Sequence, residues 1–358
     1  MNPSAGKHRM TGINERDSIL PRTGGFFFPV LAIALLVAVC GSLTLGKYPV
    51  SLRDMSAFFL QKIFDAGQMS PEAYQLLGNV IIDIRLPRIL AAALIGASLS
   101  VSGAAFQAMF VNPLVSPGLL GVLAGASFGA AFGMVFLKSW IAVQTSSFAF
   151  GCAAVLISVG IAKMYRGNTV LLLVLGGVIT GALFTSLLSI IKYVADPYNQ
   201  LPAITLWLMG GLSHADAHTL GLVAAPQMGS ILLIALLAGY LNVLSMGDEE
   251  ARALGVPVER VRALLIFLAT LASALTVVTA GTIGWVGLII PHIARMLVGP
   301  DNKRAVPAAA LIGAVYLIIV DDVSRLLFSV EIPIGITTSL VGIPFFAFVL
   351  RKSRRGWS

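Results

Sequence analysis

The chain has 358 residues, of which 57% are hydrophobic and only 11% charged, and its mean hydropathy is +0.91. Soluble domains carry about 25% charged residues, so this composition excludes an ordinary soluble protein and indicates one that crosses a membrane many times. The net charge of +8 does not indicate nucleic-acid binding, because the basic residues fall at the ends of apolar segments. The two cysteines, Cys40 and Cys152, lie inside apolar segments and predict neither a disulfide nor a thiolate metal site.

The apolar runs predict an all-α membrane protein with ten transmembrane helices. Residues 26–45 carry no charge and can cross a bilayer core of about 30 Å at about 1.5 Å per residue. Long unbroken runs favour helices over barrel strands, which would alternate over about 10 residues. The predicted segments, in chain order, are 26–46, 86–108, 117–137, 146–165, 169–193, 220–244, 263–281, 286–298, 305–327 and 336–351.

The distribution of Lys and Arg predicts the orientation of this bundle. If the N-terminus lies in the cytoplasm, the larger share of the 24 basic residues falls on the inner side, as the positive-inside rule requires. An even number of helices then places both termini inside. The chain divides into a cytoplasmic tail at 1–25, a transmembrane domain at 26–351 and a basic cytoplasmic tail at 352–358. The first tail is too long and too polar for a typical cleaved signal peptide.

A charged stretch, 246–262, separates two apolar segments on the predicted inner side. Ser245 stands three residues before Asp248, the spacing of an N-cap, and acidic residues occupy the first turn, where the helix dipole favours them. Gly255 is expected to end this helix, and Pro257 to begin a second short helix that ends at the close of the stretch. The resulting elbow could be a handle for a soluble partner, or an ordinary solvated loop.

Two arginines flank a proline at the predicted outer mouth of the second segment. Arg85 and Arg88 carry planar, permanently charged groups that match carboxylates, so the pair could seat an acidic partner surface. Alternatively, they could be anchors whose side chains reach the lipid headgroups. The preceding connection, 47–85, is expected to contain an amphipathic helix at the membrane surface. In the ninth segment, the run 321–325 holds two aspartates three and four residues before an arginine, the spacing of ion pairs within a helix.

Several segments contain irregular features. Small residues crowd the stretch 96–105, which predicts close helix packing inside the bundle. The following cytoplasmic turn, 107–118, is closed by two prolines and could be a rigid connection or a constriction. The glycine-rich run 281–292, interrupted by a proline, predicts a broken helix sheltered by protein, with His292 as a packing residue. The short apolar stretch 204–209 predicts a half-helix in place of another crossing.

One cluster of metal-ligand residue types occurs, at His214, Asp216 and His218. On a helix the two histidines would share a face while the aspartate points away, which leaves two ligands where zinc takes three or four. The spacing therefore does not favour a metal site. The chain also has no glycine-rich phosphate-binding motif of the form Gly-x-x-x-x-Gly-Lys-Ser/Thr, so any ATP that powers it must be bound by another chain.

Separated motifs follow one another in order from residue 85 to residue 350. They are Arg85-Leu-Pro-Arg88, Gly103-Ala-Ala-Phe-Gln107, Asn112-Pro-Leu114, Pro117-Gly-Leu-Leu-Gly121, Leu254-Gly255, Gly287-Leu-Ile-Ile-Pro291-His292, Asp321 to Arg325 and Ile332-Pro-Ile-Gly335. Together they closely resemble the FecCD-type permeases, the membrane subunits of type II ATP-binding-cassette importers for iron-siderophores, haem and vitamin B12.

The resemblance implies an architecture and a set of partners. It implies a homodimer or pseudo-homodimer of ten-helix subunits in the cytoplasmic (inner) membrane of a bacterium or archaeon, with the pathway along the dimer axis. Two cytoplasmic ATPase subunits would bind the elbow and move it as a lever. A substrate-binding protein would dock on the outer face. Beyond these proteins, the cargo and membrane lipid are the expected partners, with no nucleic acid, and neither a metal nor a cofactor is expected in this chain.

The resemblance also implies roles for particular residues. The acidic residues of the binding protein would meet Arg85, Arg88 and Arg325. The turn with Asn112 and Leu114 would contribute to the inner gate. The ATPase-coupling residues would be Met246, Gly247, Asp248, Glu249, Glu250, Ala251, Arg252, Ala253, Leu254 and Gly255.

The sequence thus predicts a permease subunit that is not itself an enzyme and that imports a metal chelate. Ferric siderophore is the preferred cargo, and haem and cobalamin are the alternatives within the family. A secondary transporter driven by an ion gradient is the rival from another class, but it would need acidic or polar residues at the middle of the membrane, and the apolar segments carry almost none. A membrane enzyme has no supporting set of nucleophile, base or metal ligands.

Overall fold

The computed structural model describes residues 24–353 except 66–68, 166, 168 and 214. Most of the predicted tail at 1–25, the end of the basic tail at 352–358, and His214 therefore lie outside the described residues. Within the described ranges every regular element is a helix, and no strand occurs. The expected all-α class is confirmed.

Each of the ten predicted segments has a helical counterpart. Seven described helices are long and apolar enough to cross a membrane, and three shorter apolar helices account for the remaining segments. The long ones are α1 (Gly24–Thr44), α4 (Leu86–Met109), α6 (Trp140–Met164), α7 (Thr169–Val194), α9 (Ala217–Leu236), α12 (Val258–Ala280) and α14 (Asn302–Leu326). The shorter ones are α5 (Val122–Phe132), α13 (Val286–Val298) and α15 (Ile334–Ser353). The third segment, with α5 at its centre, starts with a 3₁₀ turn and ends with a π turn, Gly133–Leu137.

The connection before the second segment is helical. It contains α2 (Leu52–Phe64) and α3 (Pro71–Gly78), each begun by a serine whose side chain accepts a backbone N–H. A π-helical stretch, Asn79–Arg85, then joins α3 to α4 in one continuous run, so the α-helix begins at Leu86, as predicted, but it continues a longer helical run. The π pattern immediately precedes Pro87, which lacks an N–H donor, and such local widening is a usual way to continue a helix through a proline.

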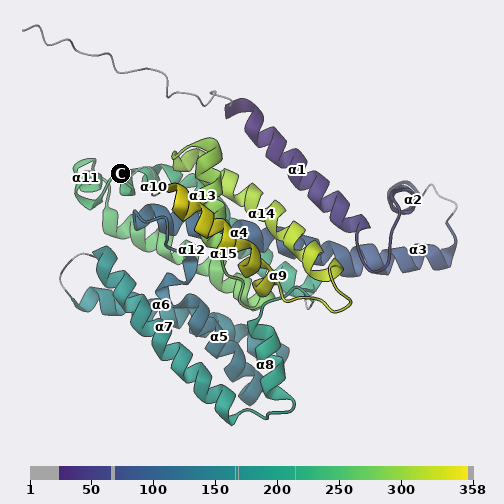
Figure 1. Cartoon of the computed structure of the whole chain (residues 1–358), viewed down its shortest axis with the longest axis horizontal. Coiled ribbons are helices and arrows are strands. Elements are labelled where there is room, and N and C mark those ends of the chain that lie inside the picture. The colour runs from purple at the N-terminus through teal and green to yellow at the C-terminus, as the bar shows by residue number, and fades with distance from the viewer. Residues whose placement is uncertain (1–23, 66–68, 166, 168, 214, 354–358) are drawn as a thin grey trace, which may run out of the picture.

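Helix α4 lies at the centre of one group of helices. It packs against α14, α12, α13 and α9, and Figure 1 shows it among them. Small residues allow this, as predicted from 96–105. A Cβ atom on Gly96 would lie 2.1 Å from the carbonyl oxygen of Gly313 in α14, and one on Gly103 would lie 1.8 Å from that of Gly287 in α13. At both points the helices meet backbone to backbone.

Replacing Gly103 by Ala should therefore push α4 away from α13 and lower the unfolding temperature of the detergent-solubilised protein. Overpacking of this kind costs about 1–3 kcal/mol. The matched control is Gly221→Ala in α9, where a Cβ would meet no atom within 4 Å. Equal unfolding temperatures for the two variants would show that the backbone contact at Gly103 is dispensable.

A second group contains α5, α6, α7 and the short helix α8 (Gln200–Leu208), which covers most of the predicted half-helix at 204–209. Phe128 of α5 and Phe184 of α7 meet at its centre with ring centroids 5.7 Å apart. Helix α12 contacts α5 and α6 and so joins the two groups. Figure 1 shows α11 (Asp248–Ala253) at one end of the bundle and α2 and α3 at the opposite end.

Candidate functional site

The elbow forms as a short helix set between two glycines. Gly247 (φ +119) precedes α11 and Gly255 (φ +79) follows it, so the predicted stop is confirmed. The predicted Ser245 cap is wrong, because this serine belongs to the end of α10 (Ala238–Leu244) and donates its hydroxyl to the carbonyl of Leu241 at 2.7 Å. The predicted separate helix after Pro257 is also wrong, since it is the first turn of α12. No glycine or proline follows Pro257 before Gly281, so α12 continues without interruption to Ala280.

Helix α11 is fixed to the start of α12 by two ion pairs. Asp248 accepts hydrogen bonds from both terminal nitrogens of Arg262, one of them at 2.9 Å, and Arg252 pairs with Glu259 at 2.6 Å. Ala251 is fully buried beneath the elbow. The hydrogen bond and the charge of Arg262 hold the pKa of Asp248 below its ordinary range. The stability that this ion pair contributes is therefore fully present above the ordinary carboxyl pKa, and it is lost as the pH falls through the lowered pKa of Asp248.

The outward face of the elbow combines acidic and apolar side chains. Glu249 and Glu250 are exposed, and Met246 and Leu254 are 61% and 62% exposed. A rigid, well-anchored helix with such a surface is suited to a soluble protein partner.

The turn predicted as the inner gate lies beside the elbow. Asn112 accepts a hydrogen bond from the N–H of Leu114 at 2.9 Å, and both side chains are exposed. A cavity of about 280 Å³ is lined by Asn112, by Ser245 at the end of α10, directly before the elbow, and by Arg295 of α13. Arg295 donates to the side chain of Gln107, which in turn donates to the carbonyl of Leu288 at 3.1 Å.

Arg295 was missed by sequence reasoning, which counted it only as a basic residue on the inner side. Its partner Gln107 lies 188 positions earlier in the chain. The one sequence signal was its place, three residues after His292 at the end of the 287–292 motif. The contact shows that α13 is connected to the end of α4 directly before the gate turn.

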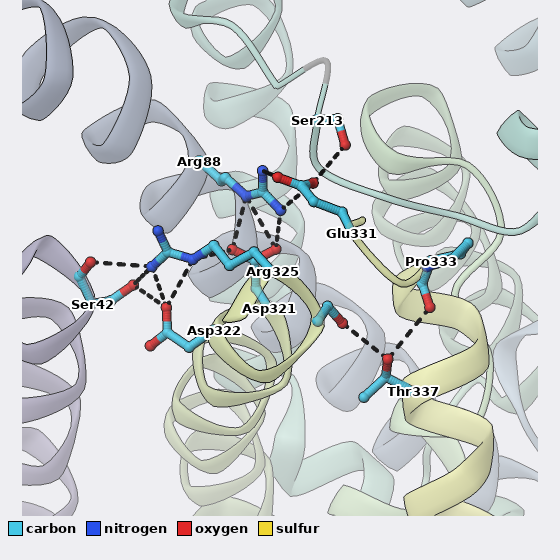
Figure 2. Close-up of polar contacts among 10 residues, drawn as sticks. Ser42, Arg88, Ser213, Asp321, Asp322, Arg325, Glu331, Pro333 and Thr337 are labelled. Carbon is cyan, nitrogen blue, oxygen red and sulfur yellow. Dashed lines mark hydrogen bonds and ion pairs between the residues drawn. The ribbon is translucent and has the colours of Figure 1, made fainter. Parts of the chain in front are cut away.

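A cluster at the predicted outer end of the bundle, called the outer cluster below, brings together two of the three predicted docking arginines. The guanidinium of Arg88 donates hydrogen bonds to both carboxylate oxygens of Asp321 at 2.9 Å. Its two terminal nitrogens also donate to the carboxylate oxygens of Glu331 at 3.2 and 3.1 Å. Arg325 pairs with Asp322 and donates to the backbone of Ser42 at 3.1 Å, as Figure 2 shows. The predicted ion pairs within α14 are confirmed, since Arg325 also lies 3.8 Å from Asp321.

The third arginine points elsewhere. Arg85 is 4% exposed and donates to the carbonyls of Leu43 and Tyr48. It therefore attaches the end of α1 and the segment after it to the helical turn that leads into α4. The alternative of headgroup anchoring does not describe Arg85 or Arg88, because both find partners inside the protein. The role of these arginines in docking stays a prediction, and the structure gives it a constraint: Arg85 and Arg325 are both buried.

Glu331 is the outermost acid of this cluster. Its side chain is 35% exposed, against 2% for Asp321. It also accepts a hydrogen bond from the hydroxyl of Ser213 at 3.0 Å. Desolvation opposes its ionisation, but the hydrogen bonds and charge of Arg88 outweigh that effect and hold the pKa of Glu331 below its ordinary range. Sequence reasoning gave Glu331 no role.

Two of the three residues weighed as metal ligands, Asp216 and His218, have other places in the fold. Asp216 caps the N-terminus of α9, accepting from the N–H of Thr219 at 2.9 Å and from its hydroxyl at 2.7 Å, while His218 is exposed in the first turn. Among the described residues no group of three His, Cys, Asp or Glu side chains is placed to hold a metal ion. Cys40 and Cys152 are free thiols.

Comparisons with known proteins show a family to which this helical chain is similar. A family model described as the FecCD transport family matches residues 34–352. The chain belongs to the FecCD transport family. The match extends further toward the N-terminus than the motifs of the sequence, because it includes most of α1.

Relatives and solved structures agree with this assignment. The molybdate import system permease protein MolB of Haemophilus influenzae is 37% identical over 326 residues, covering 91% of this chain and 95% of MolB. The hemin transport system permease protein HmuU of Yersinia pestis is 33% identical over 331 residues, covering 90% and 95%. A solved structure of a transporter classed as metal-chelate type, in an inward-facing conformation, is 36% identical with a TM-score of 0.80, covering 90% of this chain and 98% of that one.

The FecCD chain is therefore a multi-pass membrane protein with the permease fold of type II ABC importers. Other relatives carry names for iron chelatin and cobalamin transport, so the cargoes named in the family range from an oxyanion to large metal complexes. ABC importer permeases act with ATPase and permease partners.

Proposed function

We propose that this permease subunit imports a metal chelate, with ferric siderophore as the preferred cargo, and is driven by separate cassette ATPase subunits bound at α11. The observation that carries this proposal is the attachment of α11. Because Asp248 pairs with the buried Arg262 of α12, a force on the exposed face of α11 is passed to a membrane-spanning helix, while the exposed Arg252–Glu259 pair adds little. Asn112 of the gate turn and Ser245, the residue that joins α10 to the elbow, line one cavity, so a movement of α11 that is passed back through this junction can reach the turn.

The proposed pathway lies between two copies of the chain. Several described helices expose large apolar side chains, including those of α7 and α15, and such surfaces can be covered by lipid or by a second permease subunit. In the proposed inner-membrane orientation, with both termini in the cytoplasm, α11 faces the ATPases. The outer cluster then faces the substrate-binding protein.

Transport in a reconstituted system tests the proposal. Vesicles that contain the permease and its ATPase, with ATP inside and no ion gradient, should take up radiolabelled ferric siderophore in the presence of a binding protein. Uptake that needs an ion gradient and no nucleotide would support a secondary transporter instead. The same vesicles should be offered haemin, cobalamin and molybdate as competing cargoes.

Molybdate is a second candidate cargo because of one specific observation. MolB, named for molybdate import, is 37% identical to this chain over 91% of its length. Uptake of molybdate in preference to every iron chelate would replace the preferred cargo and leave the proposed ATP-driven import intact.

Arg88→Gln is the variant best suited to test docking at the outer face. Its side chain is 12% exposed and lies next to the solvent-facing Glu331, whereas reversing Arg85 or Arg325 would bury an unpaired charge. Because Arg88→Gln also takes one partner from the buried Asp321, which keeps Arg325 at 3.8 Å, docking is compared only after the unfolding temperature shows that the variant is folded. We expect the dissociation constant of the binding protein to rise roughly tenfold and its salt dependence to become weaker. Surface plasmon resonance on the transporter in nanodiscs, at low and high salt, measures both. An unchanged constant would exclude Arg88 from the docking surface.

A further inference from the structure

The two acids that pair with Arg88 differ in how far their side chains are exposed to solvent. Asp321 approaches from inside the bundle, is almost fully buried and also faces Arg325 at 3.8 Å. Glu331 approaches from the outside, on the connection 327–333 between α14 and α15, and a third of its side chain is exposed. Figure 2 shows the Arg88 guanidinium between the two carboxylates. Asp321 is thus a structural residue of the bundle interior, whereas solvent and solutes can reach Glu331.

The position of Glu331 is a complete receptor for one carboxylate. Two terminal nitrogens of Arg88 donate to its two oxygens, and the hydroxyl of Ser213 donates to one of them. These donors come from different elements, α4 and the connection before α9. A guanidinium fork with an additional hydroxyl donor matches the geometry and charge of a carboxylate on any chain.

The receptor lies at the mouth of an outer cavity. This cavity, of about 380 Å³, is lined by Arg88, Ser213 and Glu331 and by residues of α8 and the end of α12, among them Trp207 and Thr279. Residues 327–330 of the connection that carries Glu331 are exposed, with Val330 76% accessible, whereas Ile332 and Pro333 are half-buried. Besides its bonds to Arg88 and Ser213, the connection is held by a hydrogen bond from Lys47 to the carbonyl of Ser329 at 2.8 Å and by one from the N–H of Ile332 to the carbonyl of Ser324 at 3.0 Å, so the release of Glu331 frees mainly the segment around Val330.

We propose that Arg88 and Ser213 form the carboxylate receptor of the outer face, that Glu331 is its resident occupant, and that an Asp or Glu of the docking protein replaces Glu331. This inference rests on the proposed function, in which a substrate-binding protein docks at this face. The replacement exchanges one carboxylate for another, so the receptor keeps its hydrogen bonds while the connection 327–333 is released from Arg88 and Ser213. The other two arginines hold the fold, because Arg85 is bound to backbone carbonyls and Arg325 to Asp322 and Ser42.

The decisive variant is Glu331→Gln, which keeps the shape of the occupant and removes its charge. A neutral occupant competes less well for the guanidinium, so the binding protein that supports ATP-driven uptake should dock roughly three- to tenfold more tightly. The matched control is Glu72→Gln, an exposed acid at the start of α3 on the same end of the bundle. That control loses the same charge without contact to Arg88 and should leave the dissociation constant unchanged.

Two further variants test the receptor itself. Ser213→Ala removes one donor from any occupant and should weaken docking about twofold in the Glu331→Gln background, where competition is already reduced. Arg88→Gln combined with Glu331→Gln should bind no better than Arg88→Gln alone, because no receptor remains for the incoming carboxylate. Additive effects of the two substitutions would overturn the proposed competition at Arg88.

A local measurement separates this inference from the proposed function. A spin label on a cysteine at Val330, in the transporter in nanodiscs without any binding protein, should become more mobile in the Glu331→Gln variant. Unchanged mobility and unchanged docking would overturn the role of Glu331 while ATP-driven import stands. If no binding protein docks even to the unmodified transporter, the proposed docking fails. The spin label then still reports whether Glu331 restrains the connection. Tighter binding of free citrate by Glu331→Gln with unchanged protein docking would assign the receptor to small carboxylates and overturn the proposal.

Discussion

Replacing Asp321 by Asn should destabilise the folded permease by about 3–5 kcal/mol, the usual cost of removing one partner from a buried ion pair. The carboxylate of Asp321 is bound by both Arg88 and Arg325, and the residue is 1% exposed. Without its charge, these two guanidinium groups must share the remaining acids, of which Asp322 and Glu331 each face only one of them. The variant should therefore unfold at a clearly lower temperature in detergent.

The control for this prediction is Glu259→Gln, which breaks the ion pair with Arg252. Both members of that pair are largely exposed, at 50% and 70% of their side-chain surfaces, so solvent screens the attraction and the unfolding temperature should hardly change. If the unfolding temperature of Asp321→Asn equals that of this control, the outer cluster does not stabilise the fold.

Reversing the two exposed acids of α11, with Glu249→Lys and Glu250→Lys together, should reduce ATP-driven uptake by roughly tenfold or more, since opposed like charges at an interface cost several kcal/mol. Neither glutamate makes an ion pair within the described part of the chain, and both side chains face solvent. The permease should therefore fold and melt as before. We expect the transport defect to appear only when the ATPase has to act on α11.

Two rates measured in the same vesicles test this interpretation. Uptake should fall while ATP hydrolysis by the partner subunits continues, or both should fall together if the ATPase no longer binds. Glu72→Lys, on the outer face, is the matched control and should transport normally. Full uptake by the α11 variant would show that this face of the elbow is not where the ATPase acts on the permease.

Local chemistry explains what could be predicted from the sequence. The apolar runs located the ten helices, Gly255 marked the end of α11, and the spacing of Asp321 and Asp322 before Arg325 anticipated ion pairs within one helix. These features depend on neighbours a few positions apart. The wrong Ser245 cap shows the limit of such reasoning, because the residue closes the preceding helix α10 as its C-cap and does not begin α11.

The remaining features depend on contacts between distant parts of the chain. Arg88 and Glu331 are separated by 243 positions, and Arg85 and Leu43 by 42. No local pattern indicates that one arginine binds an acid on a distant connection while its neighbour binds backbone carbonyls. The sequence therefore predicted which residues carry charge at the outer face but not which of them are left accessible to a partner.

The bare glycine contacts of α4 have a mechanical consequence. With backbone lying directly on backbone at Gly96 and Gly103, there are no side chains to change rotamer and absorb a displacement. A helix of 24 residues is about 36 Å long, and α4 carries Arg88 in its first turn and ends directly before the turn with Asn112. Because α4 is held by backbone contacts at two points along its length, a displacement of its Arg88 end should move the whole helix and so reach the turn at its other end.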